Sequence, residues 1–179
     1  MVDIEEQIGQ LESQISTVLA DIDRCVNELL VDSGGRQFVA ERLPKLGSAA
    51  LPSILKLLGP DIDDIEVRFL AGLVGVALGD RSVCVTELFE ELARGGRYKY
   101  YAADNLVGHR IPGAVEAILE ALELRPLDDA MFINSLLSIL HRAGGTLPLK
   151  LRNRLLLGGS EVTSSLQYYF PADVTPPIS

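Results

Sequence analysis

Residues 51–80 read LPSILKLLGPDIDDIEVRFLAGLVGVALGD, and this stretch predicts two helices joined by a short acidic turn. The first helix ends in a Leu-Leu pair, the turn contains Pro60 and a group of aspartates, and the second helix opens near Val67 and Arg68. Proline interrupts a helix because it lacks an amide hydrogen, and aspartate caps the start of the next one. The stretch therefore favours an all-α chain of helical hairpins.

The same pattern returns along the chain at intervals of 30 to 34 residues. Two series of apolar residues, seven positions apart, share these separations: Leu51, Val85, Val115 and Leu149, then Leu58, Leu92, Leu122 and Leu156. Gly-Gly pairs at 34–35, 95–96, 144–145 and 158–159 are suited to helix ends. A period of this length is typical of stacked helical repeats. We expect the second helix of each hairpin at about 50–58, 83–93, 113–123 and 147–157, with a fourth unit that departs from the others.

These residues carry a family resemblance. Residues 51–80 resemble the join between HEAT repeats, and YYAADNLVGHRIPGAVEAILEALE, residues 100–123, resembles the short HEAT-like repeats of bilin lyases and many bacterial scaffolds. The resemblance covers about 36–157 and implies a right-handed α-solenoid of about four HEAT-like helical hairpins. Gly72 and Gly75 depart from the pattern, so we expect a bent or short helix there.

A long amphipathic helix is predicted within residues 1–33. Its apolar residues follow each other at spacings of four and three: Ile4, Ile8, Leu11, Ile15, Val18, Ile22, Cys25 and Leu29. This stripe suits either a coiled-coil seam or the inner face of a docked helix. Since no flanking position is basic, we expect docking onto the body or onto a more basic helix, with a homodimer as the alternative. The predicted domains are 1–33, 36–159 and a short helix with a Pro-rich tail at 160–179.

The charge of the chain is concentrated at its N-terminus. The net charge is −9, and residues 1–33 alone hold eight acids and one base, Arg24. Binding of duplex DNA needs a basic surface, so this balance argues against it and is compatible with a basic protein partner. The start of the chain lacks a secretory-signal pattern, and no apolar run is long enough to span a membrane. We expect a cytoplasmic protein with no membrane partner, in which Cys25 and Cys84 are buried reduced thiols.

Acidic residues dominate the outward positions predicted for the two central second helices. They are Glu87, Glu90, Glu91, Glu116, Glu120 and Glu123, whereas the outer helices present Lys56, Arg152 and Arg154. An acidic face of this kind selects a basic protein or peptide through complementary charge. These six glutamates are the predicted partner-binding residues, and ordinary solvated surface charge is the alternative interpretation.

A second candidate surface is basic and aromatic. Residues 94–101 read RGGRYKYY, and Arg110 follows about one helix later. Interleaved basic and aromatic residues bind single-stranded nucleic acid or a local anion, so Arg94, Arg97, Lys99 and Arg110 form a predicted patch of this type. The acidic group at 61–66 is interpreted as a helix start capped by Asp63 or Asp64, with a weak cation site as the alternative. His109 and His141 are predicted to lie at helix ends.

The chain has none of the common catalytic motifs, such as a phosphate-binding P-loop, G-x-S-x-G or H-E-x-x-H. We therefore expect no enzyme, no cofactor and no metal site. The leading hypothesis is a protein-binding adaptor or inhibitor, of the kind that an immunity protein represents for a toxin. The alternatives are a bilin-lyase-like ligand chaperone and a nucleic-acid-binding HEAT-like protein.

Overall fold

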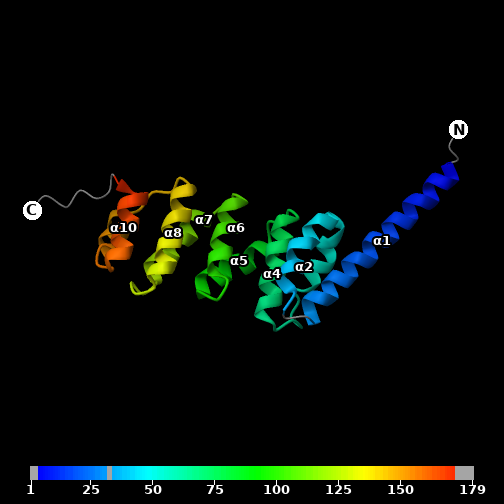
Figure 1. Cartoon of the computed structure of the whole chain (residues 1–179), viewed down its shortest axis with the longest axis horizontal. Coiled ribbons are helices and arrows are strands. Elements are labelled where there is room, and N and C mark those ends of the chain that lie inside the picture. The colour runs from blue at the N-terminus through cyan, green and yellow to red at the C-terminus, as the bar shows by residue number, and fades with distance from the viewer. Residues whose placement is uncertain (1–3, 32–33, 172–179) are drawn as a thin grey trace, which may run out of the picture. The chain divides into compact units, whose positions relative to one another are not determined.

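The computed structural model describes residues 4–31 and 34–171, and in these ranges the regular secondary structure is all helical, with no strand (Figure 1). The all-α prediction is confirmed. None of the helices described is long and apolar enough to cross a membrane. The elements are α1 (Ile4–Val31), α2 (Arg36–Arg42), η1 (Leu43–Leu46), η2 (Ser48–Ala50), α3 (Leu51–Lys56), α4 (Ile65–Ala77), α5 (Val83–Arg94), α6 (Lys99–Gly108), α7 (Ala114–Leu124), α8 (Ala130–Arg142), α9 (Leu149–Leu155) and α10 (Ser160–Tyr169), where η marks a 3-10 helix.

The chain forms two compact units, Met1–Glu87 and Leu88–Ser179, and the division falls inside α5. In the first unit α1 packs on α2, η1 and α3, and α4 packs on α2 and α3. In the second unit α6, α7 and α8 pack on one another, and α10 packs on α8 and α9. The domain limits predicted from the sequence, 1–33, 36–159 and 160–179, stay a prediction. The first helix, α1, and the last, α10, both pack on other helices of their own compact units.

Helix α4 begins and packs as its sequence dictates. The carboxylate of Asp64 accepts hydrogen bonds from the amides of Glu66 (2.9 Å) and Val67 (3.3 Å), which confirms Asp64 as the N-cap. The helix then continues for 13 residues through both of its glycines, so neither one ends it. At Gly75 a Cβ atom would lie 2.0 Å from Sγ of Cys84. Glycine at this position is therefore what lets the start of α5 approach α4.

The apolar repeat is reflected in burial. Ile54 in α3, Leu88 in α5 and Ile118 in α7 hold the same place in the repeat, and each has no exposed surface. The fourth repeat departs from this pattern of burial, as the sequence predicts. In α9 the buried apolar residues are Leu151 and Leu155, whereas the anchor positions Leu149 and Leu156 are 67% and 38% exposed.

Helix α1 is a long helix, and the body of its unit covers only the last part of its apolar stripe. Docking of the rest onto a more basic helix, or pairing in a homodimer, stays a prediction. Only Ile22, Cys25 and Leu29 of the stripe are buried. The remaining stripe residues, Ile4, Ile8, Leu11, Ile15 and Val18, are between 37% and 72% exposed. The physical reason is length: α1 has 28 residues and α2 only seven, and the first half of α1 extends past the helices of its unit (Figure 1).

Candidate functional site

Helix α7 presents an acidic face. Glu116, Glu120 and Glu123 are all exposed, and their spacings of four and three place them along one side of the helix. The opposite side is buried through Ala114, Ile118, Ala121 and Leu122. The apolar pattern that fixes the inner face of α7 therefore also fixes the direction of the three carboxylates.

These three carboxylates line a groove between α7 and the start of α9. Its other lining residues are Leu119, Pro148, Lys150 and Leu151, and its volume is about 310 Å³. Nζ of Lys150 lies 3.0 Å from Oε1 of Glu123, and both side chains are mostly exposed. An exposed pair of this kind contributes little to stability, so an incoming basic group can replace it at low cost. The groove thus already accommodates one ammonium group beside its carboxylates.

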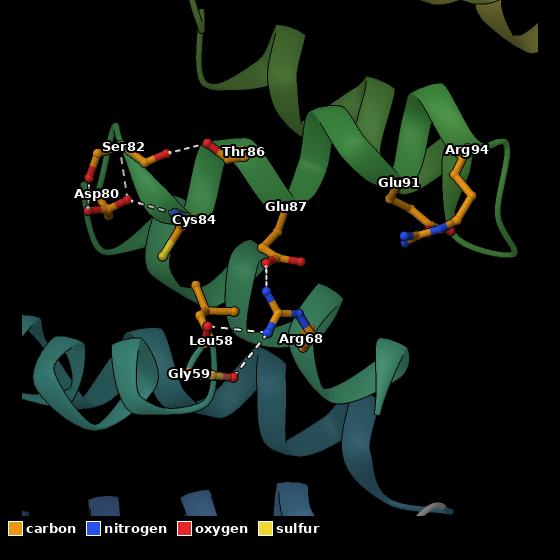
Figure 2. Close-up of polar contacts among 10 residues, drawn as sticks. All are labelled: Leu58, Gly59, Arg68, Asp80, Ser82, Cys84, Thr86, Glu87, Glu91 and Arg94. Atoms are coloured by element: carbon orange, nitrogen blue, oxygen red, sulfur yellow. Dashed lines mark hydrogen bonds and ion pairs between the residues drawn. The ribbon is translucent and has the colours of Figure 1, made fainter. Parts of the chain in front are cut away.

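Glu87 is not available to a partner, so its assignment to the predicted binding face is wrong. Its carboxylate is buried and forms an ion pair with Arg68 of α4, as Figure 2 shows. The same guanidinium donates to the carbonyl oxygens of Leu58 (3.2 Å) and Gly59 (3.1 Å). Arg68 therefore holds together the turn after α3, the first turn of α4, and α5, and Glu87 neutralises its charge.

Glu91 is also buried, at 1% exposure, which corrects its predicted outward position. Its carboxylate accepts a hydrogen bond from the amide of Tyr98 (2.7 Å) and pairs with Arg94 (2.6 Å), the latter drawn in Figure 2. A Cβ atom at Gly96 would lie within 2.2–2.5 Å of this carboxylate. Glu91 therefore closes the turn between α5 and α6, and the glycine after the helix is the sequence signal for it.

The other residues predicted to point outward also include both exposed and buried side chains. Glu90 is exposed on α5, and Lys56 is exposed on α3, as expected. Arg152 of α9 is buried, and Arg154 is half-buried because it donates to the carbonyl oxygen of Leu122 (2.8 Å). The outward basic character predicted for α9 is therefore carried by Lys150.

The four residues of the predicted anion or nucleic-acid patch differ in their contacts. Arg94 is paired with Glu91, and Nζ of Lys99 lies 2.9 Å from Oδ2 of Asp129 and 4.3 Å from the ring centre of Phe132. Arg97 is exposed beside the ring of Tyr98, and Arg110 is exposed with a backbone φ of 54°. Two of the four cations are therefore already neutralised by carboxylates of their own unit.

A second groove, between α6 and α8, did not follow from the sequence. It is lined by Tyr100, Tyr101, Asp104, Met131, Ser135 and Ile139 and has a volume of about 390 Å³. Met131 is 72% exposed there and Tyr101 is 53% exposed. The lining comes from two helices about 30 residues apart in the chain, so no local motif marks it.

Three residues with side chains that often carry chemistry, Asp64, His109 and His141, have structural roles here. Asp64 lies 2.8 Å from the guanidinium of Arg36. The ring of His141, in the last turn of α8, lies 5.7 Å from the ring of Tyr169 in α10 and 5.9 Å from the ring of Phe170, the residue after α10. His109 caps the C-terminus of α6. Within residues 4–31 and 34–171, no group of three or more His, Cys, Asp or Glu side chains is placed to hold a metal ion.

No protein-family model matches this chain, and neither a curated protein nor a solved structure is significantly similar to it. The functional interpretation therefore depends on the geometry alone.

Proposed function

We propose that this protein is a non-enzymatic interaction module, an adaptor or inhibitor that works in the cytoplasm and binds a basic partner through the groove between α7 and α9. The observation that carries the proposal is the line of Glu116, Glu120 and Glu123 along that groove. Three carboxylates beside apolar Leu119 and Leu151 suit a peptide or loop that alternates Lys or Arg with apolar residues. Glu90 on α5 belongs to the proposed surface as a peripheral acid.

The proposed architecture is a right-handed HEAT-like solenoid of about four hairpins. Ile54, Leu88 and Ile118 hold the same place in three successive repeats, and their equal burial supports this architecture. In solenoids the second helices of the hairpins line one face, which is where partners bind. A groove at α7 and α9, two of the proposed second helices, agrees with that use of the fold.

The experiment is affinity capture from cells that produce the protein, followed by binding measurements on the purified partner. The charge-reversed variant is Glu116→Lys/Glu120→Lys, and the control is Asp128→Lys/Glu161→Lys, which makes the same charge change at exposed positions outside the groove. We expect the groove variant to weaken binding about 10-fold or more and the control by less than about twofold, as isothermal titration calorimetry reports. If the groove variant and the control variant bound the partner with equal affinity, the result would contradict the proposal.

The two alternative functions are tested separately. A nucleic-acid binder must use the exposed Arg97 and Arg110, so it should bind single-stranded oligonucleotides at low salt and lose binding in the Arg97→Glu/Arg110→Glu variant. The apolar groove of α6 and α8 is the place where a bilin-lyase-like chaperone would hold its ligand. A shift in the absorbance of an added linear tetrapyrrole, lost in Met131→Asp, would favour that function.

A further inference from the structure

The first half of α1 carries an apolar stripe that no described element of its own unit covers. Six large apolar residues in its first 16 positions are 37% to 72% exposed: Ile4, Ile8, Leu11, Ile15, Val18 and Leu19. The stripe continues into Ile22, Cys25 and Leu29, which are buried against the unit. An exposed stripe that joins a buried one marks a surface for another molecule.

The stripe has the residue order of a two-stranded coiled coil. Taking Ile4 as the first d position, the a positions are Ile8 and Ile15 and the next d positions are Leu11 and Val18. Ile8 and Ile15 at a with Leu11 at the central d position form the combination that favours two strands. The flanking d residues, Ile4 and Val18, are β-branched. A partner helix can therefore pair with α1 from residue 4 to about 19, where contact with the body begins.

Charge indicates which helix this is. Between residues 4 and 23 the acids are Glu5, Glu6, Glu12, Asp21 and Asp23, and there is no base. The first base, Arg24, is 2.5 Å from Asp21 of the same helix. A second copy of the chain would add an equal number of acids, and an anionic lipid surface would repel them. A helix with Lys or Arg beside its own apolar stripe would form ion pairs along both edges.

We propose that residues 4–19 of α1 dock a basic amphipathic helix of a partner protein as a two-stranded coiled coil. This site belongs to the first unit and stands independently of the groove proposed above. A seam of little more than two heptads gives modest affinity, and because ion pairs at its edges are exposed, that affinity falls as salt rises.

The test uses the full chain and two synthetic probes of three heptads each. Both carry Ile at a and Leu at d; one has Lys at every e and g position, and the other has Glu there. Fluorescence anisotropy should show at least about 10-fold tighter binding of the Lys peptide, with the preference reduced at about 0.5 M salt.

Neighbouring substitutions localise the site. Ile15→Asp places a carboxylate in the stripe, and Ser16→Asp makes the equivalent charge change one position away on the exposed polar side. We expect Ile15→Asp to lower the affinity for the Lys peptide about 10-fold or more and Ser16→Asp to lower it less than about twofold. Glu12→Lys should reduce the preference for the Lys peptide. The groove variant Glu116→Lys/Glu120→Lys should keep the preference, which separates this proposal from the preceding one.

Sedimentation velocity on the protein alone tests the alternative that a second copy of the chain covers the stripe. A dimer that Ile15→Asp converts to a monomer would show that a second copy covers the stripe and would overturn the proposal. Equal affinity for the Lys and Glu peptides, or no binding of the Lys peptide, would overturn it as well.

Discussion

At the scale of single residues, Gly75 controls how closely α4 and α5 approach. A methyl group there would meet Sγ of Cys84 at 2.0 Å, inside a fully buried contact. We expect Gly75→Ala to lower the free energy of unfolding by about 1–3 kcal/mol because the core must shift to accept it. Gly108→Ala is the matched control, since a Cβ at Gly108 meets nothing within 4 Å.

Urea denaturation of both alanine variants checks this prediction. Gly108→Ala should be neutral or stabilising by up to about 1 kcal/mol, because alanine favours helix over glycine. Adding Cys84→Ala to Gly75→Ala should recover part of the loss, since the two side chains compete for one space. Identical stability of the two single variants would show that α4 and α5 are not packed this closely.

Asp80 is a residue whose charge matters for stability. Burial acts to raise the pKa of its carboxyl group, but hydrogen bonds from the amides of Cys84 and Ser82 and from the Ser82 hydroxyl outweigh burial, and the pKa lies below its usual 3.8. A lowered pKa in the folded state means that stability gained from the carboxylate is present above about pH 4 and is lost as the pH falls through the folded value.

The Asp80→Asn variant should therefore have a flatter dependence of unfolding free energy on pH in acid than the wild type. Thermal unfolding followed by circular dichroism from pH 6 down to about pH 3 measures that slope. Asp63→Asn, at an exposed position of the acidic turn, is the control and should leave the slope nearly unchanged. If Asp80→Asn kept the wild-type dependence of unfolding free energy on pH, the Asp80 carboxylate would not be the group that stabilises the fold.

At the scale of the elements, Arg68 connects three helices through one guanidinium. Replacing it with leucine leaves the Glu87 carboxylate buried without its charge partner and frees the carbonyl oxygens of Leu58 and Gly59. We expect Arg68→Leu to cost about 3–5 kcal/mol in unfolding free energy. Arg142→Leu removes an ion pair with Asp104 in which both side chains are more than half exposed, and should cost less than about 1 kcal/mol in the same measurement.

Helix α1 should divide into a part that stabilises the fold and a part that does not. Deleting residues 1–15 removes four residues of the stripe, Ile4, Ile8, Leu11 and Ile15, all of which are exposed, and should change the urea midpoint very little. Leu29→Ala empties a fully buried position and should cost about 2–5 kcal/mol. Strong destabilisation by the deletion would mean that the first half of α1 packs on the body after all.

The sequence was informative about helices and less informative about their polar contacts. Apolar spacing located α3, α5 and α7 and their inner faces, because burial follows helical periodicity. The burial of Glu87 did not follow from spacing, since its partner Arg68 lies 19 residues away on another helix. Gly75 and Gly108 each follow a Leu-Val pair in the sequence, yet Gly75 is tightly packed against Cys84, whereas Gly108 has open space around it. Only tertiary contacts distinguish such positions.

At the scale of the whole molecule, the two proposed surfaces belong to different compact units. The stripe of α1 lies in Met1–Glu87, and the groove of α7 and α9 lies in Leu88–Ser179. Binding energies at separate sites without shared contacts add, usually to within about 0.5 kcal/mol. If both proposals hold, the two surfaces would let the protein bind two different partners, or a single partner with two basic segments.

The last prediction distinguishes these two modes of use. If the surfaces serve two partners, Ile15→Asp will leave the affinity of the groove partner unchanged, and Glu116→Lys/Glu120→Lys will leave the Lys peptide nearly unaffected at physiological salt. If one partner spans both surfaces, both variants will weaken binding of the same partner, because each bound site raises the effective concentration of the ligand at the other site. Calorimetry with the wild type, both variants and their combination measures the difference. A combined loss greater than the sum of the separate losses would contradict independent surfaces.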